Sequence, residues 1–399
     1  MAPSRIVIVG GGIIGASSAF QLATLAQQRG DDVKITLVEG SSIAAGSSGK
    51  AGGLLALDWH GPDTADLARL SYSLHASLAA EHGGADRWGY RKLDTLSVSA
   101  DLSSPSGFAK PRQRKVKHAD LFPWLSQDVL RGAEILGSTE TTAQVHPELF
   151  TKAMVELAEE KGVEVVFGTA SSLQKPSTSA KPYTLTITPR DSPSSSPLTL
   201  EADKLLVTAG PWTGRLLGEL GLKQGAGRAK SIRGSRAHSV VLKTAPGRDL
   251  PAQALFTSIK TKEGGAEPEI YNRPDGTAYA CGPTDNTDLP LLASDVSVSP
   301  SAITSLLSQT AQLAPDYLST ENGEYSATVE RRQACYLPVG SGDPVIGCIE
   351  GGGERGVWVG SGHSCWGICN GPGTGLVLAE MMLNKDGRAT SADVDALMP

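Results

Sequence analysis

The chain has 399 residues, of which 40% are hydrophobic and 20% are charged. This composition is that of an ordinary globular protein, and no apolar run approaches the ~18 residues that a transmembrane helix needs. The net charge of -6 argues against a nucleic-acid surface, because binding to phosphate backbones requires a basic field. The basic run KPRQRKVKH at 110–118 is a local exception, which we interpret as a solvated loop.

The cysteines indicate a reducing compartment. There are five, an odd number, and no two are spaced as C-x-x-C. The first expected strand begins near Arg5, which leaves no room for a signal peptide, and the last residues carry no peroxisomal address. We therefore expect a cytoplasmic protein.

The first 40 residues predict a strand, a tight turn, a helix and a second strand. The short β-branched run 6–9 is typical of a strand that is buried on both faces. Apolar residues then recur at helical spacing until Gly30, and 33–38 form the next strand. This is a βαβ unit, whose crossover we expect to be right-handed.

Later segments repeat this nucleotide-binding pattern in the middle and at the end of the chain. We expect helices over 64–81, 147–161 and 300–313, strands over 90–99 and 163–168, a Ser- and Pro-rich hairpin over 171–197, and mainly strands over 231–332. The sequence thus predicts an α/β fold in which two domains interleave. The expected dinucleotide-binding domain spans 1–88, 145–225 and 333–399, and the expected substrate domain, with a mixed or antiparallel sheet, spans 89–144 and 226–332.

Gly10, Gly12 and Gly15 form G-x-G-x-x-G between the first strand and its helix, which is the context that this motif requires. Gly12 lets the backbone approach a pyrophosphate, and Gly15 allows the helix to pack closely on the strand. Glu39 ends the second strand, where a carboxylate accepts hydrogen bonds from a ribose diol. We predict a dinucleotide site, with NADP disfavoured by this acid.

Five further motifs carry a family resemblance. After the glycine turn come GSSGKAGGLL, ADKLLVTAGPWT, RPDGTAYACG, DPVIG and GHSCWGICNGPGTG, in that order. In this order the chain resembles FAD-dependent oxidoreductases of the D-amino acid oxidase type, a group that contains glycine oxidase, sarcosine oxidase and the fructosyl amine oxidases. Within the group it is most similar to a poorly characterised fungal and plant branch. The resemblance implies FAD as the cofactor.

The resemblance also implies which residues hold FAD. Ser47 and Ser48 offer donors to the pyrophosphate, Lys50 brings a positive charge, and a glycine-rich loop over 362–375 reaches the flavin ring. A helix from about Thr374 is expected to point its positive end at that ring. The other expected cofactor contacts are Ile13, Ile14, Gly40, Ala51, Gly52, Ser171, Ala209, Gly210, Trp212, Gly362, His363, Cys365, Trp366 and Gly367.

Cys335 has two interpretations. In sarcosine oxidase and the fructosyl amine oxidases, a cysteine in the pattern C-x-x-x-x-T-[PA]-D is bonded to the flavin, and Cys335 takes that position. The Thr and Asp of the pattern are absent here, and the loop to Pro344 is one residue short. The sequence therefore leaves open covalent attachment and a plain buried thiol.

The residues that would bind substrate depart from the family. Where glycine oxidase carries Arg-Pro to hold the substrate carboxylate, this chain has Leu337 and Pro338. The oxygen-activating lysine of the covalent oxidases falls at Ala278 or Tyr279, and Lys50 is its substitute unless it only pairs with phosphate. Five arginines could replace the missing one, of which we favour Arg332: Arg233, Arg236, Arg273, Arg331 and Arg332.

The function predicted from the sequence is FAD-dependent oxidation of a C–N bond in a small amine or amino acid derivative, with oxygen as acceptor. One alternative is a dehydrogenase with another acceptor, and a second is a flavin-binding interaction or trafficking protein that uses the basic run. No metal site or nucleophilic triad is indicated. The sequence does not fix the oligomeric state, and we take a monomer as the working assumption.

Overall fold

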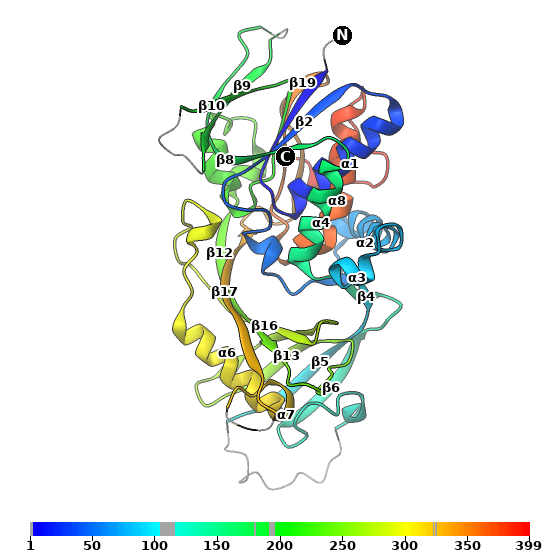
Figure 1. The fold of residues 1–399 in the computed structure, drawn as a ribbon, viewed down its shortest axis with the longest axis vertical. Helices are drawn as coiled ribbons and strands as arrows, with labels where there is room; N and C mark the ends of the chain where they lie inside the picture. Colours follow the sequence, from blue (N-terminus) through cyan, green and yellow to red (C-terminus); the bar gives the residue numbers. More distant parts are fainter. Residues whose placement is uncertain (1–2, 104–115, 179–180, 191–195, 322, 324) are drawn as a thin grey trace.

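The computed structural model describes residues 3–103, 116–178, 181–190, 196–321, 323 and 325–399. Two large sheets follow one another along the long axis of the molecule, and both chain ends lie in the half that holds the first sheet (Figure 1). Most of the basic run at 110–118 lies outside the described residues. Among the helices of the described part, none combines the length and the apolar character that crossing a bilayer requires.

Eight strands of the described residues form the first sheet, in the order β10-β9-β8-β2-β1-β11-β19-β18. Its centre, from β8 to β19, is parallel, and Ile6, Val7 and Ile8 of β1 are at most 2% exposed because both faces are covered. The predicted βαβ unit and the α/β fold class are confirmed. The strands are β1 Ser4–Val9, β2 Val33–Glu39, β8 Glu164–Gln174, β9 Tyr183–Pro189, β10 Leu198–Ala202, β11 Lys204–Val207, β18 Val345–Gly352 and β19 Arg355–Ser361.

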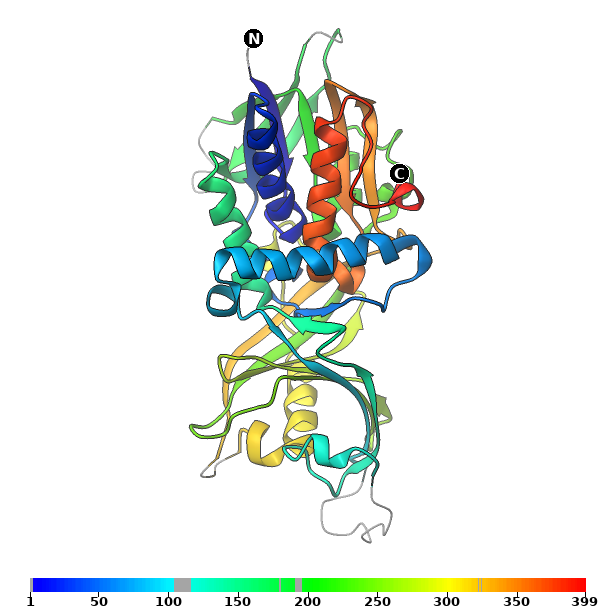
Figure 2. The same cartoon turned by 90° about the vertical axis from the view of Figure 1, so that its right-hand side faces the viewer.

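Helices cover the two faces of this sheet unequally. α1, α4 and α8 share one hydrophobic core with one face, and α2 runs across their lower ends (Figure 2). The short helix α5 packs on the opposite face. The helices of this half are α1 Ile13–Arg29, α2 Pro62–His82, α3 Gly84–Trp88, α4 Pro147–Glu159, α5 Thr213–Glu219 and α8 Gly367–Leu383.

The expected start of the last helix, near Thr374, is wrong, because α8 begins at Gly367. Its glycines serve close packing within a helix rather than a loop. A Cβ at Gly371 would lie 2.6 Å from Ile13, and one at Gly375 would lie 2.6 Å from the backbone of Ser17. These glycines let α8 approach α1 closely, so the loop before the helix is only 362–366.

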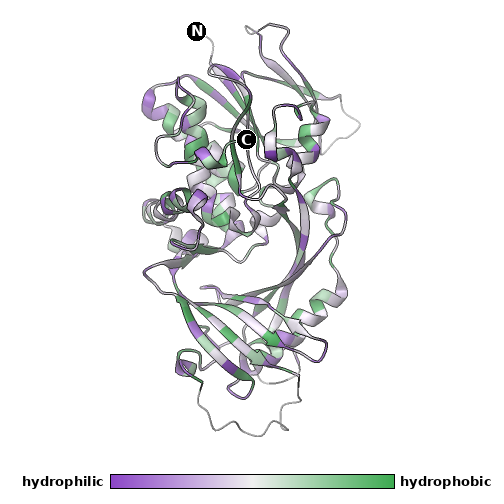
Figure 3. Cartoon of the chain, turned by 180° about the vertical axis from the view of Figure 1, so that it is seen from behind, coloured by the Kyte–Doolittle hydropathy of each residue, from purple (hydrophilic) through white to green (hydrophobic). Residues whose placement is uncertain are grey.

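The second sheet is mixed, as predicted. Its described strands run in the order β17-β12-β16-β15-β13-β5-β6, and β14 pairs with β13. One face packs on α6 and α7, and hydrophobic and hydrophilic residues alternate along the strands (Figure 3). The elements are β5 Asp94–Asp101, β6 Leu130–Gly137, β12 Arg233–Lys243, β13 Gln253–Lys260, β14 Gly265–Ala266, β15 Glu269–Asn272, β16 Thr277–Asp285, β17 Thr328–Val339, α6 Pro300–Leu313 and α7 Pro315–Leu318.

A small sheet joins the two halves, with β7 between β3 and β4. Every strand of the first sheet lies inside the segments expected for the dinucleotide domain, whereas β17 crosses the expected boundary at 332 and ends at Val339. The remaining elements are β3 Leu54–Ala56, β4 Arg91–Lys92, β7 Thr142–Gln144, η1 Ser47–Gly49, η2 Ala119–Leu121, η3 Gly210–Trp212, η4 Gly227–Ser231, η5 Ala293–Asp295, η6 Ser364–Trp366 and η7 Asp395–Leu397.

Candidate cofactor and active site

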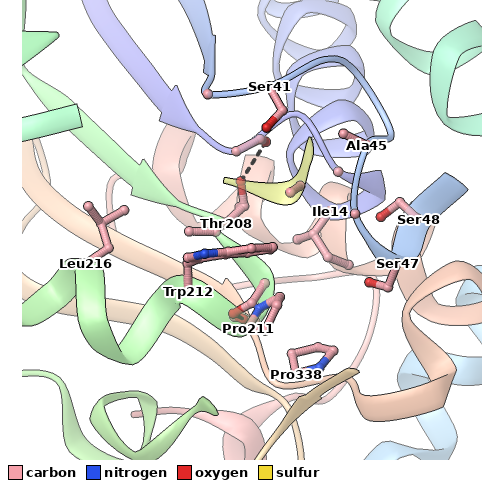
Figure 4. A pocket seen from close by; sticks show the side chains of 18 of the residues that line it. Ile14, Ser41, Ala45, Ser47, Ser48, Thr208, Pro211, Trp212, Leu216 and Pro338 are labelled. Carbon is pink, nitrogen blue, oxygen red and sulfur yellow. Dashed lines mark hydrogen bonds between the residues drawn. The ribbon is translucent and has the colours of Figure 1, made fainter. Parts of the chain in front are cut away.

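A cavity of about 440 Å³ lies at the carboxyl ends of β1, β2 and β11. This is where ligands bind in open α/β sheets. Figure 4 shows Ser47 and Ser48 on one side of the cavity, with the Trp212 indole reaching in from the other. The expected cofactor residues that line it are Gly10, Gly12, Ile13, Ile14, Glu39, Gly40, Ser47, Ser48, Ala51, Ala209, Gly210, Trp212, Gly362, His363, Cys365 and Gly367.

The glycine turn leaves no room for side chains. Gly10 has φ +118°, a conformation that other residues rarely adopt. A Cβ at Gly15 would lie 1.9 Å from the Gly10 carbonyl oxygen, and one at Gly12 would lie 3.0 Å from the Ser48 hydroxyl. Gly15 therefore serves the packing of α1 on the turn behind the cavity, whereas Gly12 keeps the cavity floor open.

Glu39 is held in place by its own turn. One carboxylate oxygen accepts the Gly11 N–H at 2.7 Å, and the other accepts the Ser41 N–H at 2.7 Å. Burial raises the pKa of Glu39, while these two N–H groups oppose that rise. Each oxygen keeps a second acceptor site, so the carboxylate can receive the two hydroxyls of a ribose.

Two helix N-termini end at the same cavity. Ile13 begins α1 and Gly367 begins α8, and both line the cavity. Neither N-cap residue caps its helix with a side chain, and the Ile13 N–H donates to the Ser48 hydroxyl at 2.9 Å. Both N-termini therefore offer a positive partial charge to a ligand. Just before α8, Ser364 lines the cavity with φ 50°, a strained conformation for a serine that is common at binding sites.

These features fit FAD. A carboxylate with acceptor sites for a diol, an open glycine turn beside Ser48 and a second helix N-terminus all line one cavity. The far end, near Cys365, meets Leu337 and Pro338 of β17, which belongs to the second sheet. A dinucleotide in this cavity would thus extend its ring end toward the second sheet.

Lys50 and Cys335 lie beside the cavity rather than in its lining. The Lys50 ammonium donates to the Ala334 carbonyl at 3.1 Å and faces a second cavity, which Glu148 and Arg331 also line. Burial lowers the pKa of Lys50, whereas burial raises the pKa of Cys335 to about 11. The ammonium and the thiol are therefore neighbours at the junction of the two halves.

Four other expected residues also lie outside the lining. Ser171 directly follows the lining residue Ala170, and its hydroxyl donates to the Thr186 carbonyl. Gly52 packs against a ring of the second sheet, and Trp366 packs on His60 at 4.4 Å between ring centroids. Arg332 is exposed on β17.

The other arginines that could bind a carboxylate have different partners. Arg236 forms an ion pair with Asp285, Arg331 forms one with Glu148, and Arg233 is exposed. Arg273 is buried, where it donates to the Ala51 carbonyl and lies 3.3 Å from a ring nitrogen of His146. Among the arginines of the described residues, Arg215 lines the cavity. Its guanidinium donates to the carbonyls of Leu289 and Pro290.

Sequence reasoning missed a loop that closes one side of the cavity. Leu291, Leu292, Ala293 and Asp295 line it, and they follow β16 of the second sheet. The Trp212 indole N–H donates to the Pro290 carbonyl at 2.7 Å, and the Ser294 N–H donates to the Ser41 hydroxyl at 3.3 Å. No motif marks this loop. Thr208 was also missed, although its place after β11 and before Ala209 could have indicated it.

The parallel sheet, the cavity at its carboxyl ends and the second sheet at the ring end define a two-domain dinucleotide-binding protein. More narrowly, the chain belongs to the family described as FAD dependent oxidoreductase (DAO), whose profile matches residues 5–381. The resemblance predicted from the motifs is confirmed, and the chain is an FAD-dependent oxidoreductase of this family.

Known relatives match over most or all of their length. A protein of Schizosaccharomyces pombe, provisionally named an oxidoreductase, is 37% identical over 415 residues, covering 100% of this chain and 99% of its own. Glycine oxidase from Geobacillus kaustophilus is 25% identical over 405 residues, covering 96% and 93%. The crystal structure of that species' glycine oxidase superposes with a TM-score of 0.73 over 99% of this chain and 98% of its own, at 22% identity. Iminodiacetate oxidase from Chelativorans gives 0.70 at 20% identity, with 99% of each chain covered.

Proposed function

We propose that the protein oxidises the C–N bond of a small amine or amino acid derivative and passes the electrons to oxygen. The observation that carries the proposal is the position of the cavity's far end, where Cys365 and the N-terminus of α8 meet Leu337 of the second sheet. Relatives of this fold are named glycine oxidase and iminodiacetate oxidase, and both names describe oxidation of an amino compound. In this family FAD supplies the two-electron acceptor.

The chain's own residues then bind and orient. Glu39 would hold the ribose, and the open floor at Gly12 beside Ser48 would take the pyrophosphate. The N-terminus of α8 would place positive partial charge at the ring end, which favours a ring that gains electrons. Leu337 and Pro338 present an apolar wall to the reacting centre.

The test is anaerobic mixing of the purified holoprotein with a panel of small amines and amino acids, followed by flavin absorbance. Bleaching by at least one amino compound, and hydrogen peroxide on admitting air, are expected. A flavin that no member of the panel reduces would refute the proposal.

A second candidate differs only in the acceptor. Two residues could take the position of the oxygen-activating lysine, Ala278 and Tyr279. Of these, Tyr279 is directed toward Lys50, because its hydroxyl donates to the Lys50 carbonyl at 2.9 Å. A neutral phenol in place of a lysine favours a dehydrogenase. Reoxidation rates with oxygen and with a quinone separate the two candidates, since oxygen should react faster only in an oxidase.

Attachment of FAD to Cys335 is a further part of the proposal. Cys335 is buried and lies two residues before Leu337 on β17, so both side chains point to the same face. Acid precipitation should leave yellow colour in the pellet, and Cys335→Ser should release it to the supernatant. Complete release from the wild type, at the mass of the bare polypeptide, would make Cys335 a buried thiol.

A further inference from the structure

Beyond the cofactor site, one face of the second sheet carries an acid among aromatic rings. Phe256 of β13 and Cys281 of β16 both stand opposite Glu269 of β15, so the three side chains share a face. Tyr271, two residues further along β15, points the same way. This face is turned toward the first half, because Tyr271 packs in one cluster with Leu54 of β3.

This face lies next to the ring end of the cofactor cavity. A Cβ on Gly52 would lie 2.5 Å from the Tyr271 ring, and Ala51, the preceding residue, lines the cavity. On the other side, Cys365 lines the cavity and lies near Glu269. Burial raises the pKa of the Cys365 thiol, and the nearby Glu269 carboxylate raises it further. The Glu269 side chain therefore lies on the face of the second sheet that is turned toward the cavity.

A series of aromatic contacts begins beside the acid, at Phe256 and Tyr271. Phe256 lies 6.2 Å from Tyr271 and 5.5 Å from Trp59 between ring centroids, and Trp59 lies 6.4 Å from Trp366. Trp59, Phe256, Trp366, Glu269 and Cys281 all remain half-buried although they crowd together. Each of these five residues therefore keeps part of its surface accessible to solvent. We name these six side chains, Trp59, Phe256, Glu269, Tyr271, Cys281 and Trp366, the Glu269 recess.

Glu269 has no cationic partner among the described residues. Its carboxylate accepts the Tyr271 hydroxyl at 2.5 Å and lies 3.7 Å from the Cys281 sulfur. The nearby cations have other partners: Arg273 binds the Ala51 carbonyl and Lys50 binds the Ala334 carbonyl. A partly buried carboxylate without a counter-ion is costly, and a cationic ligand would remove that cost.

We propose that the Glu269 recess binds the ammonium group of the substrate, and that the substrate is an amine with no carboxylate on its reacting carbon. A carboxylate flanked by aromatic faces attracts a cation twice, by charge and by the ring quadrupoles. An anionic group would meet Glu269 and the apolar Leu337, with no arginine of the described residues in this part of the cavity lining. The inference rests on the proposed amine oxidation and names its substrate class.

The same carboxylate has a use in the reaction. An amine gives up hydride only in its neutral form, and moving one proton from the ammonium nitrogen to a Glu269 oxygen leaves a neutral amine and a carboxylic acid. Burial raises the pKa of Glu269, which favours that transfer. Glu269 thus binds the charged substrate and holds its proton.

Binding of ions that cannot be oxidised tests the recess without turnover. The holoprotein is titrated with benzyltrimethylammonium and with benzoate, each followed by calorimetry and by the absorbance of bound flavin. The cation should bind more tightly than the anion, and Glu269→Gln should weaken cation binding by roughly 10- to 100-fold. Glu269→Asp, which keeps the negative charge, should retain part of the cation affinity that Glu269→Gln loses. The control is Glu201→Gln, because Glu201 forms an exposed ion pair with Arg5. This variant should change neither the binding of the cation nor that of the anion. Tighter benzoate binding, or cation binding that ignores Glu269→Gln, would overturn the proposal.

Matched substrates separate this inference from the proposed function. Benzylamine is compared with phenylglycine, and putrescine with ornithine, by anaerobic flavin reduction. Faster reduction by the member without a carboxylate supports the inference. If only the amino acids reduce the flavin, amine oxidation stands and the inference fails. If neither class reduces it while benzyltrimethylammonium still binds through Glu269, the oxidation fails and the cation site stands.

Discussion

His363 offers a quantitative test of the loop that precedes α8. Its ring is 3% exposed, and one ring nitrogen lies 2.9 Å from the Thr374 hydroxyl inside α8. Burial lowers the pKa of His363 to about 4, from an ordinary value of 6.5. The folded protein therefore favours the neutral ring, and His363→Gln removes the titration while keeping a polar side chain.

The sign follows from the order of the two pKa values. The folded pKa is the lower one, so the unfolded chain takes up the proton first as the pH falls below 6.5. The stabilisation is complete above that value and is lost progressively down to about pH 4. Between about pH 7.5 and about pH 5.5, linkage predicts a loss of about 1.3 kcal/mol from this one residue.

The assay is urea unfolding at these two pH values, in excess FAD, for the wild type, His363→Gln and Thr374→Val. The wild type should lose about 1.3 kcal/mol more than His363→Gln, since all other titrating groups are shared. Thr374→Val should lower stability by roughly 0.5–1.5 kcal/mol at both pH values and keep the wild-type slope. Equal losses in the wild type and His363→Gln would show that the imidazole is not held neutral.

Three further changes probe the cofactor site and its support. Gly12→Val should give a colourless protein, because a side chain beside the Ser48 hydroxyl fills the cavity floor; a yellow variant would misplace the cofactor. Glu39→Gln should weaken FAD binding by roughly 1.5–3 kcal/mol in a titration of the apoprotein, and an unchanged Kd would place the ribose elsewhere. Glu380→Gln should lower the free energy of unfolding by about the same amount, because its buried carboxylate accepts hydrogen bonds from both the backbone and the hydroxyls of Thr390 and Ser391; unchanged urea unfolding would contradict this.

The sequence was most informative where a local pattern determines the structure. The β-branched run of β1, the glycines at 10, 12 and 15 and the acid at 39 act within 40 residues. The end of this run at Val9, together with Gly10, Gly12 and Glu39, lines one cavity. The start of α8 could not be predicted this way. Gly371 and Gly375 read as loop residues until α1 is known to pack against them.

The candidate site shows the same limit. Ser47 and Ser48 line the cavity, but the 3-10 turn over Ser47–Gly49 directs Lys50 to the other side. The loop with Leu291 reaches the cavity from the second sheet, so only the tertiary fold brings it there. Glu269 gave no signal either, because an acid on a strand indicates nothing until its face is known.

The strand order of the first sheet has a consequence for synthesis on the ribosome. In the sheet, β1 lies between β2 and β11, and β19 pairs with the other edge of β11. In the sequence, β2 follows β1 closely, whereas β19 ends only at Ser361. At a translation rate of about 5–20 residues per second, roughly 16–65 s separate β2 from β19. During that interval the growing sheet has an unpaired, strongly apolar edge, first at β1 until β11 is made and then at β11 until β19 is made, and such an edge invites aggregation. Overproduction in a fast-translating host should therefore yield more insoluble protein than slow expression with co-produced chaperones.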